Sequence, residues 1–347
     1  MEFARLTQGA ADAITDALAG RRRGIAVSTS GSTGDPLEVL LTADALRASA
    51  EATATELGGQ GHWLLALPTD RIAGAMVVVR AALAGSAVTG VAHGSFTPEA
   101  FAAAAERLPQ NGPRFTSLVP TQVRRLLDSV EGRDALTSFD AVLVGGAAVS
   151  AESLPTNLVR TYGLTETAGG CVYNGTPIGD TAVRLSAEGR VLIATSSLAE
   201  DYRPSQPDAW EQWDGRRWLV TADLGAWTAN GKLTILGRVD DVITTGGLKV
   251  HPRTVEAAID GLAWFKECAV VGAPDAEWGQ SVMAFVAPFA LGENKRLWEL
   301  RSALEPSLPK HALPREMVVV EELPRLDSGK VDYPALRRLA DSMERND

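Results

Sequence analysis

Cysteine, histidine and aromatic residues are scarce in this chain. Its 347 residues include two cysteines and four histidines, and aromatic side chains make up 6%. Cys171 and Cys268 are far apart and belong to no Cys-x-x-Cys or Cys/His cluster, so their spacing does not predict a zinc site. Because no secretory hydrophobic segment is found near the N-terminus, we expect a reduced protein of the cytoplasm.

Clustered positive charge and long apolar runs are also missing. Lys and Arg number 33 against 43 Asp and Glu, a net charge of −10, and the one basic run, residues 21–23, is typical of a solvated loop. This balance argues against a polyanionic partner, so we expect no binding to nucleic acid. The most apolar stretch, residues 72–85, is too short to span a bilayer and contains Arg80, so we expect no membrane insertion.

Short apolar runs alternate with helical patterns over residues 25–165. Strands are predicted at 25–29, 63–67, 87–91, 115–119, 141–144 and 158–161, and helices at 43–56, 73–83, 98–108 and 121–129. This alternation is typical of parallel βαβ units with helices on both faces of the sheet. Ligands of such sheets bind at the carboxyl ends of the strands.

The pattern changes after residue 177 to short strands separated by Gly, Asp and Asn turns. These strands are predicted at 182–185, 191–195, 218–222, 226–227 and 233–236. A small β-barrel or a twisted antiparallel sheet fits this stretch. The residues that follow are typical of a compact α+β unit. We therefore predict an α/β protein with a large N-terminal domain (1–236) of parallel βαβ sheets plus a small β-barrel region, a hinge (237–241), and a smaller, mobile C-terminal α+β domain (242–347).

Residues 27–37 read Val-Ser-Thr-Ser-Gly-Ser-Thr-Gly-Asp-Pro-Leu, a short apolar strand that leads into a turn rich in hydroxyls and glycine. Successive free N–H groups in such a turn form a concave anion site, and the hydroxyls add donors. The pattern predicts phosphate binding, and a solvated turn is the alternative for this stretch taken alone. It is not the P-loop of kinases and GTPases, because no Gly-Lys-Ser/Thr closes it.

Four further motifs follow along the chain. They are residues 161–167 (Thr-Tyr-Gly-Leu-Thr-Glu-Thr), 221–225 (Thr-Ala-Asp-Leu-Gly), 237–250 (with Gly-Arg-Val-Asp-Asp and Gly-Gly-Leu-Lys-Val) and 323–332 (Leu-Pro-Arg-Leu-Asp-Ser-Gly-Lys-Val-Asp). The Glu166 carboxylate could hold Mg²⁺, a hard cation that prefers oxygen ligands, although taken alone it is better explained as an acid near a helix start. Asp223, an acid after a strand, is suited to accept hydrogen bonds from ribose hydroxyls.

In this order, the five motifs resemble the adenylate-forming superfamily of acyl-CoA synthetases, luciferases and peptide-synthetase adenylation domains. The resemblance extends from Ser28 to Lys330. It implies a reaction in which a carboxylate attacks the α-phosphate of ATP and releases pyrophosphate. A thiol, usually that of coenzyme A, then displaces AMP from the acyl-adenylate. The resemblance thus implies ATP and coenzyme A as co-substrates and Mg²⁺ as the cofactor.

The resemblance also assigns roles to single residues. Glu166 would hold Mg²⁺, Thr165 would touch phosphate, and Lys330 would reach the charge that develops at the α-phosphate. Losing such a preorganised charge typically costs ~2.7–4 kcal/mol of transition-state stabilisation, and the alternative for Lys330 is a surface cation on a loop. The implied ATP site has Ser30, Gly31, Ser32, Thr33 and Gly34 at the phosphates and Asp223 with Arg238 at ribose. It also includes Gly145, Gly146 and Ala147, which would line the adenine and acyl pocket, Tyr162, which would pack on adenine, and Gly163.

Asp240 resembles the hinge residue about which members of this family rotate the small domain. A hinge absorbs a large change of backbone angles at a few positions, and Asp tolerates unusual angles better than most residues. After the rotation, Gly246, Gly247 and Lys249 would serve thioester formation. The two glycines would let a pantetheine arm pass close to the backbone.

The chain departs from the usual family pattern in its phosphate loop. Asp35 and Leu37 stand where lysines are common, which makes the loop less cationic, and we expect Asp35 to point to water. The loop is reached as early as Ser28, and the stretch from Gly146 to Tyr162 is short. The position of the phosphate loop so near the start of the sequence resembles the short actinobacterial branch of o-succinylbenzoate–CoA ligases of menaquinone biosynthesis. The sequences at 65–68, 72–74 and 117–122 resemble that branch as well.

That branch implies formation of o-succinylbenzoyl-CoA. The acyl-site candidates are Arg71, Thr121 and Gly170, and the Arg71 guanidinium would pair with the succinyl carboxylate, with a pair to Asp70 or a surface charge as alternatives. Another short aryl- or acyl-CoA ligase, a stand-alone adenylation enzyme and a non-catalytic nucleotide-binding relative are also considered. We expect a small carboxylic acid, ATP and CoA as partners. A homodimer is also considered. Cys171 is interpreted as a packing residue.

Overall fold

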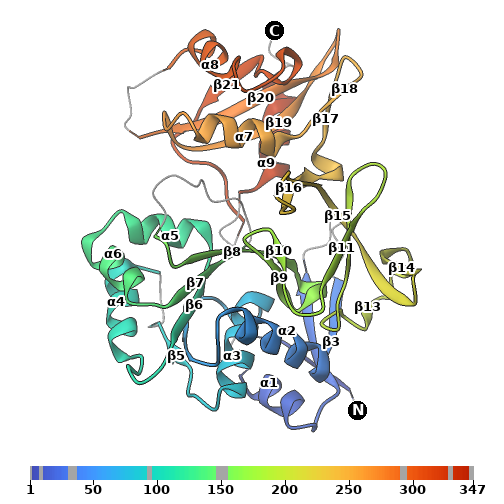
Figure 1. Cartoon of the computed structure of the whole chain (residues 1–347). Coiled ribbons are helices and arrows are strands. Elements are labelled where there is room, and N and C mark those ends of the chain that lie inside the picture. The colour runs from blue at the N-terminus through green and yellow to red at the C-terminus, as the bar shows by residue number, and fades with distance from the viewer. Residues whose placement is uncertain are drawn as a thin grey trace.

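The structure, a computed structural model, describes residues 2–7, 11–29, 37–91, 96–145, 155–289, 295–326 and 331–343. Figure 1 shows a larger lower part, which ends with β16, and a smaller upper part, which begins with β17. The short helix η3 (Val239–Asp241) connects them. Over the described ranges, no helix combines the length and the apolar character needed to cross a membrane.

The largest sheet has seven strands in the order β10-β9-β8-β7-β6-β4-β5. Five strands run parallel, namely β4 (His62–Leu65), β5 (Thr89–Gly90), β6 (Arg114–Leu118), β7 (Ala141–Val144) and β8 (Leu158–Leu164). The strands β9 (Gly169–Tyr173) and β10 (Thr176–Pro177) continue the sheet in antiparallel fashion. The predicted parallel βαβ region is confirmed, and the carboxyl ends of β6, β7 and β8 lie along one edge.

Helices cover both faces of this sheet, because successive side chains of a strand point to opposite faces. Leu64 of β4 packs among residues of α4, α5 and α6, whereas its neighbour Trp63 packs against α3. The helices are α1 (Ala11–Leu18), α2 (Ala43–Glu56), α3 (Ile72–Leu83), α4 (Pro98–Arg107), α5 (Pro120–Leu127) and α6 (Val130–Thr137). The short helices α1 and α6 were not predicted from the sequence.

The strand that precedes the phosphate loop belongs to a separate sheet. β2 (Gly24–Thr29) pairs in parallel with β1 (Phe3–Arg5) and antiparallel with β3 (Leu37–Thr42), and β3 pairs with β13 (Asp201–Arg203). The prediction that residues 25–29 begin the parallel sheet is therefore wrong. The chain returns alongside β2 as a β-hairpin, and an apolar run does not by itself distinguish a hairpin from a βαβ unit.

A third sheet is antiparallel, in the order β11-β12-β15-β14, and β16 pairs with β15. Its strands are β11 (Ala182–Leu185), β12 (Arg190–Ala194), β14 (Trp210–Trp213), β15 (Arg216–Trp227) and β16 (Leu233–Arg238). This confirms the predicted region of short antiparallel strands, although β15 is one long strand where two were expected. β16 continues past residue 236, and the exact domain boundary stays a prediction.

The C-terminal part is the predicted α+β unit. Its sheet has the order β18-β17-β20-β19, and β21 lies beside β20. The elements are β17 (Ile243–Thr245), β18 (Leu248–Val250), α7 (Pro252–Asp260), β19 (Phe265–Asp275), β20 (Gly279–Pro288), α8 (Leu297–Leu304), β21 (Glu316–Val319) and α9 (Tyr333–Met343). Val270 packs with α7 and α8 on one face, and Val271 packs with α9 on the other. The hairpin β17–β18 was not predicted.

Candidate functional site

Tyr162 and Asp223 connect two sheets. Tyr162 lies on β8 of the seven-stranded sheet and Asp223 on β15 of the antiparallel sheet. The tyrosine hydroxyl donates a hydrogen bond of 2.8 Å to Asp223 Oδ2. Burial raises the pKa of Tyr162 above its ordinary value, and the Asp223 carboxylate raises it further. The phenol therefore stays protonated and remains the donor.

Arg238 lies on the other side of the same carboxylate. Asp223 and Arg238 are register partners on β15 and β16, and Arg238 Nη1 is 3.7 Å from Asp223 Oδ1. The Asp223 N–H donates to the Thr221 hydroxyl at 3.0 Å, which fixes the backbone here. Asp223 is only 9% exposed, whereas the Arg238 side chain is half-exposed. The pair presents a hydrogen-bond acceptor and a cation side by side.

Glu166 is held close to this pair. It lies in the short helix η1 (Thr165–Thr167) after β8, and its carboxylate Oε1 accepts a hydrogen bond of 2.9 Å from the Tyr202 hydroxyl. Burial raises the pKa of Glu166 above its ordinary value, while the Tyr202 hydrogen bond opposes this increase. The charges of Asp223 and Arg238 also act on this carboxyl group, the first raising its pKa and the second lowering it.

The oxygen donors here suit a hard divalent cation. No group of three or more His, Cys, Asp or Glu side chains within the described part of the chain could hold a metal ion. Mg²⁺ is commonly held by one or two carboxylates and completes its shell with substrate phosphates and water. Glu166 supplies one such carboxylate, oriented by the Tyr202 hydroxyl, so the residues present fit a cation that is also held by the phosphates of a substrate.

Three of the predicted glycines lie where a side chain would collide with the sheet. A Cβ atom at Gly163 would be 2.0 Å from the carbonyl oxygen of Gly169, because β8 and β9 are packed closely. At Gly145, which follows β7, a Cβ would be 2.9 Å from Thr161 Oγ1, and at Gly170 it would be 3.0 Å from Thr161 Cβ. Packing within the sheet therefore requires glycine at position 163, where the obstacle is backbone. At positions 145 and 170 a Cβ would force the Thr161 side chain to shift.

The acyl-site candidates follow two adjacent strands. Arg71 is exposed and directly precedes α3, which follows β4, and the pair with Asp70 considered from the sequence is not among the ion pairs of the described residues. Thr121 is half-buried in the first turn of α5, which follows β6. The next residue, Gln122, donates a hydrogen bond of 2.8 Å to the Ala66 carbonyl oxygen, which attaches α5 to the end of β4.

The predicted hinge residues take part in ion pairs. Arg238 Nη2 lies 3.7 Å from Asp240 Oδ2, and Asp241 accepts a hydrogen bond from Arg337 of α9. Gly237 has a φ of +144°, a backbone angle that glycine adopts more readily than other residues. The connection between the two parts of the molecule is therefore linked to β16 on one side and to α9 on the other.

Gly246 and Gly247 form the turn between β17 and β18. Their φ angles are +56° and +78°, and the Gly246 N–H donates a 2.9 Å hydrogen bond to the Trp278 carbonyl oxygen. A Cβ at Gly246 would be 2.5 Å from the Trp278 ring, whereas a Cβ at Gly247 would meet nothing within 4 Å. Lys249 is exposed on β18. The pKa of Glu188, in the larger part, is lowered mainly by a hydrogen bond from the Ser186 hydroxyl, and the charge of Lys249 lowers it further.

Several predicted residues lie outside the described residues. These are Ser30, Gly31, Ser32, Thr33 and Gly34 of the phosphate loop, with Asp35, as well as Gly146, Ala147 and Lys330. Tyr202, by contrast, is a described residue of the site that sequence analysis missed. It lies on β13, 36 positions after Glu166, and no motif in its neighbourhood signals it.

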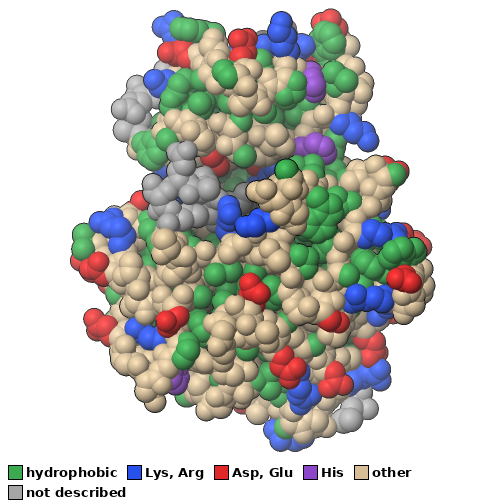
Figure 2. Space-filling model, in the orientation of Figure 1, with side chains coloured by type: hydrophobic (Ala, Val, Ile, Leu, Met, Phe, Trp, Pro, Cys, Tyr) green, Lys and Arg blue, Asp and Glu red, His purple; other side chains and the backbone are tan. Residues whose placement is uncertain are grey.

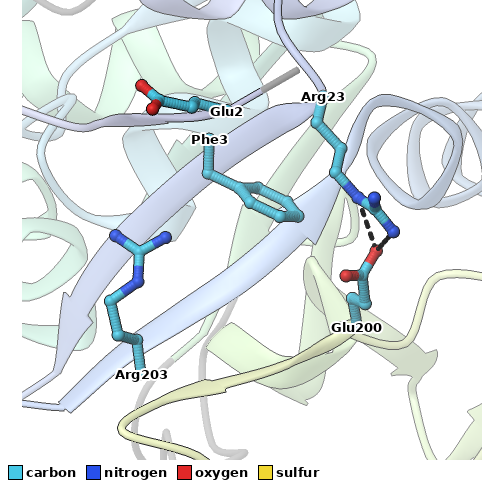
Figure 3. Close-up of a pocket in the computed structure, with 5 residues that line it drawn as sticks. All are labelled: Glu2, Phe3, Arg23, Glu200 and Arg203. Carbon is cyan, nitrogen blue, oxygen red and sulfur yellow. Dashed lines mark hydrogen bonds and ion pairs between the residues drawn. The ribbon is translucent and has the colours of Figure 1, made fainter.

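Figure 2 shows that the surface is hollowed between the larger and smaller parts, with Lys or Arg side chains along the hollow. Positive charge at such a place favours an anionic ligand. Figure 3 shows a different pocket, lined by Glu2, Phe3, Arg23, Glu200 and Arg203. Its Arg23 and Glu200 already pair with each other, at 2.9 Å from Nε to Oε2, and none of the predicted site residues lines it.

A parallel sheet, an antiparallel sheet and a separate α+β unit, with Tyr162, Glu166, Asp223 and Arg238 gathered at their junction, define a fold of the adenylate-forming class. Residues 27–198 match the family of AMP-binding enzymes, and residues 254–330 match the AMP-binding enzyme C-terminal domain. The chain belongs to the AMP-binding enzyme family.

Its relatives include 2-succinylbenzoate–CoA ligases. The chain is 41% identical over 324 residues to a probable 2-succinylbenzoate–CoA ligase of Mycobacterium tuberculosis, which covers 90% of this chain and 84% of the relative. It is 28% identical over 331 residues to the 2-succinylbenzoate–CoA ligase of Listeria monocytogenes, covering 89% of this chain and 68% of that one. The predicted family resemblance is confirmed.

Solved structures agree with this assignment. The o-succinylbenzoate CoA synthetase of Bacillus subtilis, in complex with the acyl-adenylate intermediate, superposes with a TM-score of 0.74 at 25% identity and covers 90% of this chain and 68% of that chain. ATP-bound MatB from Rhodopseudomonas palustris superposes with a TM-score of 0.80 at 23% identity over 92% of this chain and 68% of that chain, a similarity of fold.

Proposed function

We propose that this chain is an ATP-dependent acid–CoA ligase that converts 2-succinylbenzoate to its CoA thioester. In the first step, an oxygen of the acid attacks the α-phosphorus of ATP, and pyrophosphate leaves. In the second step, the thiol of coenzyme A attacks the acyl carbon, and AMP leaves. The observation that carries the proposal is the cluster of Tyr162, Asp223 and Arg238, found in a chain that is 41% identical to a probable 2-succinylbenzoate–CoA ligase.

The cluster is suited to hold the nucleoside of ATP. Asp223 has a buried carboxylate that can accept hydrogen bonds from the ribose hydroxyls, and Arg238 supplies a donor and a positive charge beside it. The hydroxyl of Tyr162 is already engaged by Asp223, so its ring is held in one orientation and can pack on the adenine base. Such fixed positioning is the main contribution of a protein to phosphoryl and adenylyl transfer.

Glu166 and Thr165 are the proposed contacts to the metal and to phosphate. When bound, Mg²⁺ would neutralise charge on the phosphate oxygens. Tyr202 orients the Glu166 carboxylate and favours its ionised form, which is the form that binds a cation. Ser30, Gly31, Ser32, Thr33 and Gly34 are the proposed phosphate cradle, and Lys330 is the proposed cation at the α-phosphate.

The domain division proposed for this chemistry is 1–236, a hinge at 237–241 and 242–347. Rotation at Asp240 would exchange the segment that contains Lys330 for the turn of Gly246 and Gly247. The two glycines are exposed and have no side chains of their own, so a pantetheine arm could approach their backbone closely. Lys249 near this turn would attract the phosphates of CoA.

The choice of acid follows from the relatives, and Arg71 and Thr121 are the proposed contacts to it. They come after the neighbouring strands β4 and β6, at the edge where ligands of parallel sheets bind. Arg71 is exposed, which leaves its guanidinium accessible to the second carboxylate of a dicarboxylic acid.

The proposed location is the cytoplasm. Both cysteines are free thiols, which suits that reducing compartment. A homodimer is the proposed oligomeric state.

Pyrophosphate release with ATP and Mg²⁺ across a panel of carboxylic acids, with and without coenzyme A, tests the proposal. We expect release with 2-succinylbenzoate and a CoA thioester as product. Release only with other acids would support an acid–CoA ligase and refute 2-succinylbenzoate as its substrate. A thioester formed on a carrier protein and not on CoA would indicate a stand-alone adenylation enzyme. ATP binding without release for any acid would refute the catalytic proposal.

A further inference from the structure

One carboxylate on the small domain binds arginines from two distant parts of the chain. Glu267 lies on β19, and its side chain is 13% exposed. Arg124 Nη1 of α5, in the larger part, donates to Glu267 Oε1 at 2.6 Å. Arg325 Nη2, which follows β21 in the smaller part, donates to both carboxylate oxygens, each at 2.6 Å. Charge-assisted contacts of this length are strong and directional.

These contacts form a bridge, Arg124–Glu267–Arg325, and its Arg124 end is anchored to the parallel sheet. Arg124 lies in α5, and Gln122 in the first turn of that helix bonds the Val119 N–H at 3.0 Å and the Ala66 carbonyl oxygen at 2.8 Å. These bonds hold α5 against the carboxyl ends of β6 and β4. Arg124 therefore has a defined position relative to the edge where the acid and ATP are proposed to bind.

The Arg325 end borders the segment that contains Lys330. Arg325 forms a β-bridge with Val331, and the Asp332 N–H donates to the Pro324 carbonyl oxygen at 2.8 Å. The Tyr333 hydroxyl then donates to Glu256 Oε1 of α7 at 2.7 Å. The residues on both sides of Lys330 in the sequence are thus paired with each other and fastened to the small domain.

A second acid lies beside the bridge. Burial raises the pKa of Asp260 at the end of α7, and the charges of Arg124 and Glu267 also act on this group. Asp260 accepts a hydrogen bond from the Cys268 thiol at 3.3 Å. The interface between α5 and β19 is therefore a cluster of charges and not a single exposed ion pair.

We propose that Glu267 is a positioning residue for the first half-reaction: through Arg124 it holds Arg325 and its bridge partner Val331, which flank Lys330 in the sequence, at a fixed place against the large domain. This inference rests on the proposed function. Rotation about residues 237–241 would break the Arg124 contact, which joins the two parts, and would leave the Arg325 contact, which lies within one part. The bridge therefore favours the arrangement described here over a rotated one.

The kinetic test measures the two half-reactions separately in full-length protein. Pyrophosphate release reports adenylation, and thioester formation from synthetic acyl-adenylate and CoA reports the second step. For Arg124→Ala and Glu267→Gln we expect adenylation to fall about tenfold, as a loss of positioning would cause, with thioester formation changed less than twofold. The double variant should be no slower than either single one. Arg124→Lys should recover part of the rate.

Arg125→Ala is the matched control, because Arg125 is the next residue of α5, is exposed, and takes part in none of the ion pairs between described residues. It should leave both rates within twofold. Equal losses in both half-reactions for Arg124→Ala, or no loss of adenylation, would overturn the proposal.

A measurement without substrate separates this proposal from the proposed function. Spin labels at Glu131→Cys on α6 and Glu305→Cys after α8 report the distance between the two parts, and both positions are exposed. Arg124→Ala should broaden or shift the distance distribution, and Arg125→Ala should not. An unchanged distribution in Arg124→Ala would refute the bridge even in an active ligase. A changed distribution in a protein inactive with every acid would support the bridge while the proposed function fails.

Discussion

The hydroxyl of Tyr202 donates a hydrogen bond to the carboxylate of Glu166 across 36 positions of sequence. The contact joins β13, in the sheet of the N-terminal hairpin, to the end of β8 in the parallel sheet. The donor stabilises the ionised form of a buried acid whose pKa burial raises. Two sheets that meet at the site therefore cooperate to keep a carboxylate available for a cation.

Replacing Tyr202 by Phe should shift the pH dependence of adenylation. Without the donor, the pKa of Glu166 rises further, so the acidic limb of the pyrophosphate-release profile moves to higher pH and more Mg²⁺ is needed at neutral pH. Tyr173→Phe is the control, because that buried hydroxyl bonds to Thr53 away from Glu166. Identical acidic limbs for Tyr202→Phe and the parent would show that the titration of Glu166 does not control adenylation.

Asp223→Asn should weaken the binding of ATP. The buried carboxylate loses its charge beside Arg238, and an amide replaces one oxygen acceptor by a donor, so KM for ATP should rise about tenfold while KM for the acid changes little. Asp214→Asn provides the comparison, since Asp214 is exposed in the turn between β14 and β15 and Asn tolerates its φ of +51°. Equal effects on both substrates would contradict a role at ribose.

Gly246→Ala should suppress thioester formation and spare adenylation. The new Cβ would be 2.5 Å from the Trp278 ring at a φ of +56°, so the turn must move. Gly247→Ala introduces only the strain of a φ of +78°, because nothing lies within 4 Å of its Cβ. The two rates measured on both variants check this, and we expect a larger loss for Gly246→Ala. A loss confined to adenylation would argue against the turn as the thiol-side element.

Lys330→Ala should slow pyrophosphate release by about a hundredfold or more, the typical effect of removing a preorganised charge. Thioester formation from supplied acyl-adenylate should persist, because Lys330 is proposed to act on the α-phosphate in the first step. Lys310→Ala, an exposed lysine of the same domain, is the control. An unchanged rate of pyrophosphate release in Lys330→Ala would remove Lys330 from the mechanism.

Cys171 should be inert in the native protein. Burial raises the pKa of its thiol to about 12, so almost none of the reactive thiolate is present at pH 8. Alkylation at that pH should be slow in buffer and fast in denaturant, and Cys171→Ala should retain activity. Rapid native-state alkylation that abolishes activity would instead make Cys171 an accessible residue of the site.

Local patterns identified many elements and the motifs of the site. The helix at 43–56 was predicted with its observed bounds from its apolar pattern. In the structure Thr42 caps it and Asp44 lies in its first turn, two local features that favour a helix start at this place. The strands at 141–144 and 182–185 were also predicted with their observed bounds. Both are short apolar or alternating runs between turns, a signal that depends on neighbours in sequence.

The sequence by itself determined the order of the five motifs, the family they indicate and the residue types available for adenylation. Only the tertiary structure decided that β2 pairs with β3 outside the parallel sheet, that Tyr162 bonds Asp223, that Tyr202 bonds Glu166, and that Glu267 joins Arg124 to Arg325. The physical reason is that capping and periodicity act over a few residues. Strand pairing and contacts between side chains 36 to 143 positions apart depend instead on how whole sheets pack.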